Sequence, residues 1–191
     1  MSNIDMSEKS NLIERLDRIL DWIKSCDTKA SIVIAGIGVT LTLLTSSDSL
    51  DGMKKIIISF IDNINFANLV YLIALILSLG LTIFGLINLI LVLVPRLNKF
   101  SGSISNTRTS SLYYFGKISN IDYASFKQNM EKEINTPDEI EDLLSQIYIN
   151  AQICNLKYSY YRKGIMFSFI GIVSFILLYI IGLFLLSIGG F

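Results

Sequence analysis

Three long runs of apolar residues dominate the pattern of hydrophobic and polar positions along the chain. They cover residues 30–45, 66–94 and 164–188, and no charged residue interrupts any of them. A bilayer core about 30 Å thick requires roughly 20 helical residues, which the second and third runs provide. The first run is short, but a buried helix in a soluble core rarely continues that far with so few polar residues. The pattern therefore predicts three transmembrane helices.

The charged residues are confined to the segments between the runs, and this divides the chain into six parts. We expect a cytoplasmic N-terminal helix (1–29), a first span (30–47), an external amphipathic loop (48–65), a second span (66–94), a cytoplasmic sensing module (95–163) and a third span (164–188). The predicted fold is an all-α integral membrane protein. Its N-terminal helix and the helices of its C-terminal half extend into the cytoplasm as a helical module.

The distribution of Lys and Arg predicts the orientation. Residues 1–29 hold five of them, residues 46–65 hold two, residues 95–163 hold nine, and the tail after residue 188 holds none. Because cytoplasmic segments carry an excess of Lys and Arg, the N-terminus and residues 95–163 are expected inside and the C-terminus outside. The first 29 residues do not resemble a signal peptide, since they carry charges of both signs and the apolar run begins late.

Two amphipathic stretches lead directly into the first and third spans. Both repeat apolar residues at alternating spacings of three and four, which is typical of paired helices. Pairing within one chain and pairing between chains in a homo-oligomer are both compatible with this pattern. The apolar positions are Leu12, Leu16, Ile19, Ile23 and Cys26 in the first stretch and Ile140, Leu144, Ile147, Ala151, Cys154, Tyr158 and Tyr161 in the second.

Shorter elements have their own signals. Thr136 is a candidate N-cap, with Pro137 at the first helical position and Glu139 completing a capping box. Asp122 can cap a short helix, and residues 112–118 are aromatic and strand-like. Residues 53–64 are expected to form an amphipathic helix whose apolar stripe lies in the outer headgroup layer of the membrane. The expected apolar face of the short helix consists of Tyr123, Phe126, Met130 and Ile134.

Small residues mark the faces where the spans are expected to meet, because close approach drives helix association in a bilayer. Asn88 is the amide deep in the second span, where such a group usually faces a partner helix. The two stripes of small residues are Ala74, Ser78, Thr82 and Gly85 in the second span and Gly164, Ser168 and Gly171 in the third.

The residue inventory argues against catalysis. The chain has no His, and its two Cys residues, Cys26 and Cys154, are far apart in sequence. No metal-ligand spacing, Cys-His pair or Ser-His-Asp set is therefore present, and no glycine loop links a strand to a helix as in phosphate-binding motifs. We expect a non-enzyme without a metal or cofactor, with thiols that stay reduced.

The segment 95–120 is basic and contains no Asp or Glu. One explanation is the positive-inside bias together with attraction to anionic lipid. The other is an anion site, in which Ser- and Gly-rich backbone and an arginine fork hold a phosphate and aromatic rings stack on a base. The candidate ligand-binding residues are Arg96, Lys99, Arg108, Tyr113, Tyr114, Phe115 and Lys117.

Several short motifs occur in a characteristic order. They are Asp27-Thr28-Lys29-Ala30 before the first span, Pro95-Arg96 after the second, Ser111-Leu112-Tyr113-Tyr114-Phe115-Gly116-Lys117-Ile118, and Lys157 with Arg162 before the third. In this order the chain resembles the transmembrane effectors of bacterial Pycsar anti-phage systems.

The resemblance implies a function. Such effectors act with a partner nucleotide cyclase that makes cyclic CMP (cCMP) or cyclic UMP (cUMP), and the messenger activates the effector to impair the inner membrane and give abortive infection. The implied partners are the cyclic pyrimidine nucleotide, the cyclase, the lipid bilayer and further copies of the chain, with no nucleic acid polymer. The alternatives are an effector of a related defence system with another messenger and a ligand-free oligomeric membrane scaffold.

Overall fold

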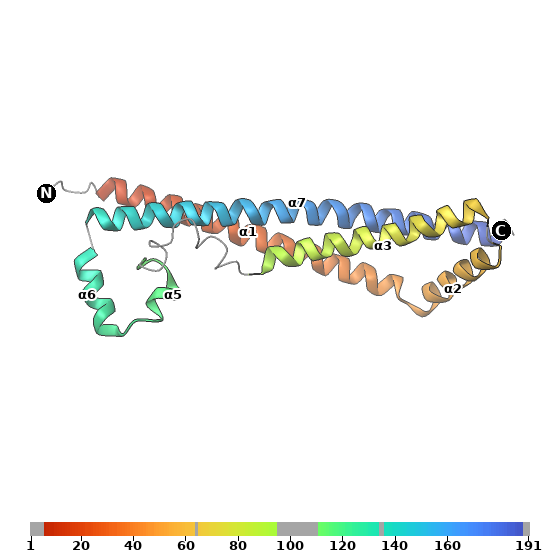
Figure 1. Ribbon diagram of the computed structural model, residues 1–191, viewed down its shortest axis with the longest axis horizontal. Helices are drawn as coiled ribbons and strands as arrows, with labels where there is room; N and C mark the ends of the chain where they lie inside the picture. Colours follow the sequence, from red (N-terminus) through yellow and green to blue (C-terminus); the bar gives the residue numbers. More distant parts are fainter. Residues whose placement is uncertain (1–5, 64, 95–110, 134–135, 189–191) are drawn as a thin grey trace. The chain divides into compact units, whose positions relative to one another are not determined.

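The computed structural model describes residues 6–63, 65–94, 111–133 and 136–188, which contain helices and no strand. Three of the helices are long and apolar enough to cross a membrane. The predicted all-α membrane fold is therefore confirmed. The helices are α1 (Met6–Leu44), α2 (Ser47–Asp62), α3 (Phe66–Leu93), α5 (Phe115–Ile118), α6 (Tyr123–Glu133) and α7 (Pro137–Ile188), as Figure 1 shows.

The chain divides into two compact units. The first, here called the head unit, comprises Met1–Ser25 and Pro95–Lys157, and the second, the span unit, comprises Cys26–Val94 and Tyr158–Phe191. Helices α1 and α7 each contribute one end to the head unit and the other to the span unit without a break. The long helix predicted from Pro137 through the third apolar run is thus observed.

The core of the span unit lies between α1, α3 and α7. Cys26, Ala30 and Ile37 of α1 are buried with Leu89 and Val92 of α3. Half-buried side chains of α7 complete this cluster: Tyr160, Tyr161, Ile165 and Ile172. Removing a fully buried leucine side chain such as that of Leu89 is expected to cost about 2–5 kcal/mol.

Small residues allow α3 and α7 to approach closely. A methyl group at Gly85 would clash with the backbone N of Ser168 and lie 2.8 Å from the carbonyl O of Gly164. Gly171 is crowded in the same way by Thr82 and Ser78. The two predicted stripes therefore do face each other. Asn88 is buried and donates from Nδ2 to the carbonyl O of Phe84, 2.8 Å away, in its own helix.

Helix α2 confirms the amphipathic helix predicted after the first span. Its Phe60 ring stacks on Tyr71 of α3 at a centroid distance of 4.3 Å, and Ile56 lies beside Gly182 of α7. These two side chains are fully buried, whereas Ile58 and Ile61 are exposed. The prediction that the whole apolar stripe faces lipid headgroups is wrong for Ile56 and Phe60, because α3 and α7 offer them a protein surface.

The predicted stripe of α7 is only partly correct in the head unit. Cys154 is buried, but Leu144 is 50% exposed and Ala151 is also exposed. The face that is buried instead contains Asp142, Leu143, Gln146 and Ile149. On this face, Asp142 accepts hydrogen bonds from Ser111 and Leu112. Such polar contacts cannot be predicted from the pattern of apolar residues. On α1, Leu16 and Cys26 are buried and Leu12, Ile19 and Ile23 are half-buried, as predicted.

The shorter elements of the head unit differ from expectation in two places. Residues 112–118 form a turn and α5, so the predicted strand is wrong. An extended segment needs a neighbouring strand, and the described part of the chain contains none. Asp122 caps α6 as predicted, since its Oδ1 accepts from the Ser125 N–H at 3.0 Å. Phe126 and Met130 are half-buried, but Tyr123 is 80% exposed, and Ile134 lies outside the described residues.

Candidate functional site

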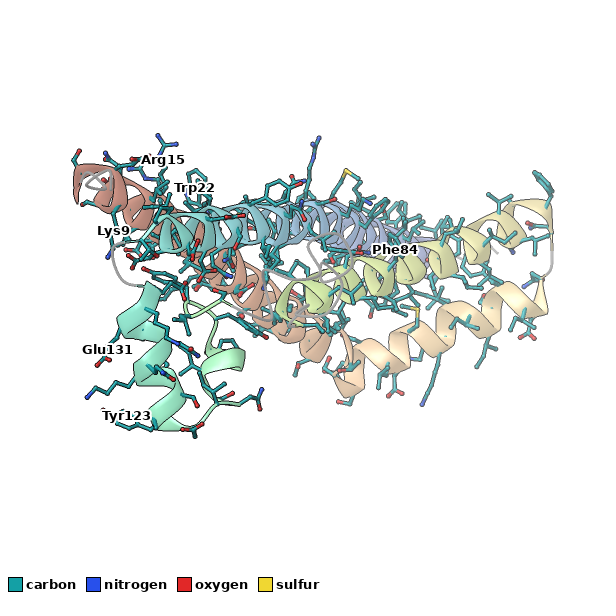
Figure 2. All side chains as sticks on the ribbon, turned by 60° about the vertical axis from the view of Figure 1, so that its left-hand side comes forward. Lys9, Arg15, Trp22, Phe84, Tyr123 and Glu131 are labelled. Carbon is teal, nitrogen blue, oxygen red and sulfur yellow. The ribbon has the colours of Figure 1, made fainter. Side chains whose placement is uncertain are left out.

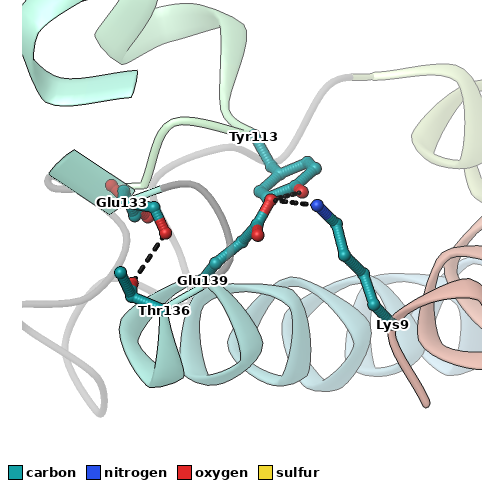
Figure 3. Close-up of polar contacts among 5 residues, drawn as sticks. All are labelled: Lys9, Tyr113, Glu133, Thr136 and Glu139. Carbon is teal, nitrogen blue, oxygen red and sulfur yellow. Dashed lines mark hydrogen bonds and ion pairs between the residues drawn. The ribbon is translucent and has the colours of Figure 1, made fainter. Parts of the chain in front are cut away.

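Two buried carboxylates at the start of α7 fasten the head unit together. Asp142 Oδ2 accepts from Ser111 Oγ at 2.8 Å and from the Leu112 N–H at 3.1 Å. Glu139 Oε1 accepts from the Tyr113 hydroxyl at 2.9 Å and lies 3.0 Å from Lys9 Nζ of α1 (Figure 3). We call these contacts the carboxylate clasp. The clasp joins residues 111–113 and α1 to α7, so these helices do pair within one chain.

The beginning of α7 shows where local sequence signals were insufficient. The helix begins at Pro137 as predicted. The predicted capping box is wrong, however, because the Thr136 N–H donates to the carbonyl O of Glu133 at 3.1 Å and the Glu139 N–H donates to the carbonyl O of Thr136 at 3.2 Å. Thr136 Oγ1 also donates to the carbonyl O of Glu133, at 2.6 Å (Figure 3). The Glu139 carboxylate is engaged by Tyr113 and Lys9. A buried carboxylate requires such partners, since an isolated buried charge is costly.

The carboxylates around Tyr113 give its surroundings a negative charge. Burial raises the pKa of the Tyr113 hydroxyl, and the hydrogen bond to Glu139 and the charges of Glu139, Asp142 and Glu133 raise this pKa further. A cavity of about 80 Å³ beside it is lined by Leu112, Tyr113, Met130, Glu133 and Glu139. This space is well below the roughly 300 Å³ of a small ligand-binding site, and its charge disfavours an anion.

The structure places only some of the predicted ligand-binding residues. Arg96, Lys99 and Arg108 lie outside the described residues. Tyr113 belongs to the clasp, and Tyr114 is half-buried, with its ring 5.0 Å from that of Phe115.

Helix α5 carries the remaining two candidates. Phe115 is 67% exposed and so has an accessible ring. Lys117 also lies on α5, but its side chain is outside the described part of the structure.

Four residues of the family motifs, Asp27, Lys29, Lys157 and Arg162, lie close in sequence to the division between the units. Asp27 is half-buried, and its backbone carbonyl accepts from Ser31 Oγ at 3.0 Å. Lys29 and Arg162 are exposed, whereas Lys157 is half-buried. The described residues contain no group of three or more His, Cys, Asp or Glu that could hold a metal ion.

A second hollow in the head unit was not predicted from the sequence. It is an open groove of about 460 Å³ between α1 and α7. Figure 2 shows Arg15 and Trp22 on one side of α1 and Lys9 on the other. A signal was present in the sequence, because residues 11, 15, 18 and 22 are spaced to share one helix face. The groove is lined by Asn11, Glu14, Arg15, Arg18, Ile19, Trp22 and Ile147.

Comparison with known proteins identifies the family. The family described as "Pycsar effector protein domain" matches residues 11–186. A protein of Gulbenkiania mobilis described as "Pycsar effector protein GmPycTM" is 33% identical over 180 residues, which cover 89% of this chain and 90% of that protein. No solved structure matches the chain. With these matches extending through both units, the chain belongs to the Pycsar effector family as a transmembrane protein of antiviral defence.

Proposed function

We propose that this chain is the membrane effector of a bacterial anti-phage system and is activated by a cyclic pyrimidine nucleotide, cCMP or cUMP, made by a partner cyclase. Activation impairs the inner membrane and leads to abortive infection. The family match over residues 11–186 carries this proposal, because it covers most of the head unit and most of each candidate span. The chain itself has no catalytic role in the proposal.

The head unit lies in the cytoplasm in this proposal, and the C-terminus lies outside. Support comes from the Lys and Arg residues, of which five fall in residues 1–29 and nine in residues 95–163. Cytoplasmic segments carry this excess. The orientation also places the head unit in the compartment where a cyclase would release its product.

Two continuous helices can carry a signal from the head unit to the membrane. Helices α1 and α7 both belong to the carboxylate clasp and both continue as spans. A ligand shifts a conformational equilibrium only as far as it binds one state better than the other. Nucleotide binding that favours one arrangement of these helices would therefore change the packing of the spans.

The basic segment is proposed to attract the nucleotide phosphate. Residues 95–120 contain no acid, so their charge is uncompensated locally. Phe115 on α5 offers an exposed ring for a base. The proposed contacts are Arg96, Lys99, Arg108, Lys117 and Phe115, together with Tyr113 and Tyr114 as neighbouring aromatics.

Coexpression with a pyrimidine cyclase tests the function. We expect membrane potential and growth to collapse when an active cyclase and this chain are both present, and neither to change with an inactive cyclase. Arg108→Ala should reduce the effect, whereas Lys132→Ala, on the exposed surface of α6, is the charge-matched control. An unchanged membrane potential with active cyclase would favour the ligand-free scaffold. Leakage induced only by a different nucleotide would favour the related system.

A further inference from the structure

The groove on α1 combines charge, an aromatic surface and an apolar floor. Asn11, Arg15, Arg18 and Trp22 follow one another at spacings of four, three and four, so they line one helix face. Ile19 and Ile147 contribute apolar surface from α1 and α7. Small-molecule sites commonly enclose about 300–1,000 Å³, and the groove offers about 460 Å³.

The groove contains one arginine that is not neutralised within it. Arg18 is bound to Glu14, with Nη2 and Oε1 2.6 Å apart. Arg15 makes no ion pair with any residue that the structure describes. A guanidinium group forms two parallel hydrogen bonds to a phosphate. The lining therefore has a net positive charge suited to one phosphodiester monoanion.

Trp22 provides a planar surface beside these charges. It is the single Trp of the chain and is 53% exposed. Exposed indole rings are typical stacking platforms for nucleotide bases, and stacking on an aromatic side chain contributes about 1–3 kcal/mol per base. Figure 2 shows Trp22 and Arg15 projecting to the same side of α1, so one small ligand can contact both.

The polar rim can hydrogen-bond to a pyrimidine. The Asn11 amide carries both donors and an acceptor, and the Glu14 carboxylate can accept from the exocyclic amine of cytosine. Both residues line the groove. The groove thus presents a partner for the phosphate, a surface for the ring and hydrogen-bonding groups for the base edge.

We propose that this groove is the seat of the activating cyclic pyrimidine nucleotide, with the cyclic phosphate on Arg15 and Arg18 and the base on Trp22. This inference rests on the proposed function. It moves the bound nucleotide from the contacts proposed in residues 96–117 to the groove and leaves the basic segment the role of attracting the anion. An anionic phospholipid headgroup is also a phosphodiester. Residues 11–25 argue against it, because their three basic residues are matched by three acidic ones, whereas segments that bind anionic lipid are polybasic.

Calorimetric titration of the purified full chain in neutral detergent with cCMP and with cUMP tests the location. We expect Arg15→Ala and Trp22→Ala each to weaken binding about tenfold or more. Trp22→Phe, which retains an aromatic ring, should stay within about threefold of the wild type. Lys132→Ala is the charge control, and circular dichroism of each variant verifies its helix content.

The outcomes separate this inference from the proposed function. If the wild type binds a cyclic pyrimidine nucleotide and Arg15→Ala and Trp22→Ala bind equally well, the groove is not the seat. Loss of binding in Arg108→Ala alone would then assign the ligand to the basic segment and preserve the function. If the wild type binds neither nucleotide, both proposals fail. If phosphatidylglycerol in mixed micelles occupies the groove and neither nucleotide displaces it, the groove is a lipid site.

Discussion

The head unit fastens its segments with hydrogen bonds to buried carboxylates, whereas the span unit brings its helices together through small residues. Asp142 and Glu139 accept bonds from residues distant in sequence, while Gly85 and Gly171 let α3 and α7 approach backbone to backbone. Polar contacts can be broken and remade by a charged ligand in water. Close packing in a bilayer responds mainly to helix position. The two units are thus held together in different ways, by hydrogen bonds to buried carboxylates in one and by close helix packing in the other.

The packing side of this comparison is tested most strongly by Gly85→Leu. The new side chain would clash with the Ser168 backbone and Gly164 carbonyl, so we expect a loss of about 3 kcal/mol or more in the free energy of unfolding. Gly80→Leu is the matched control, since nothing lies within 4 Å of its Cβ position. Unfolding in mixed detergent micelles measures both. Equal stability of the two variants would contradict the observed helix contact.

The polar side is tested next by Asp142→Ala. This change leaves the Ser111 hydroxyl and the Leu112 N–H buried without their acceptor, at an expected cost of about 3 kcal/mol. Hydrogen exchange of the Leu112 amide should then accelerate about a hundredfold. The adjacent exposed residue provides the control, Glu141→Ala. Unchanged protection at Leu112 would mean that the clasp does not hold this segment.

A smaller effect is expected from Tyr113→Phe, which removes the hydroxyl bound to Glu139. The residue is partly exposed, so we expect a loss of about 1 kcal/mol. Burial and nearby carboxylates raise the pKa of Tyr113 in the folded chain. The hydroxyl therefore makes its full contribution to the free energy of unfolding below about pH 10, the pKa of tyrosine in the unfolded chain. This contribution is lost as pH rises through the folded pKa. Alkaline unfolding followed by circular dichroism should show this loss in the wild type and not in the variant.

The smallest effect concerns Asp122, whose side chain caps α6 at the exposed edge of the head unit. Its hydrogen bonds with Ser125 lower the pKa of this carboxyl group. The cap therefore stabilises α6 fully above the pKa that Asp122 has in the unfolded chain. This stabilisation falls as pH drops through the lower pKa of Asp122 in the folded chain. Asp122→Asn keeps a capping oxygen but does not titrate. As pH is lowered into the acid range, the protection of the α6 amides against hydrogen exchange should fall more in the wild type than in this variant.

Much of the span unit could be predicted because its signals are local. The length of an uncharged run is enough to predict a span, and the small size of Gly85 and Gly171 is enough to predict a helix contact. The head unit was less predictable. The strand-like residues 112–118 contain a helix, and Leu144 is exposed while its neighbour Leu143 is buried. The burial of this face of α7 involves a hydrogen bond between Asp142 and Ser111, which is 31 positions away.

The sequence by itself determined that this chain is a helical membrane protein, where its long helices run, and which family it resembles. These properties follow from hydropathy, helix periodicity and short motifs, which need no knowledge of distant contacts. Tertiary structure alone decided which carboxylates are buried, that Tyr113 is engaged by Glu139, and that Arg15 and Trp22 share a groove with Ile147. Burial and hydrogen bonding between residues far apart in sequence set these features, and the local pattern indicates only that Arg15 and Trp22 share a helix face.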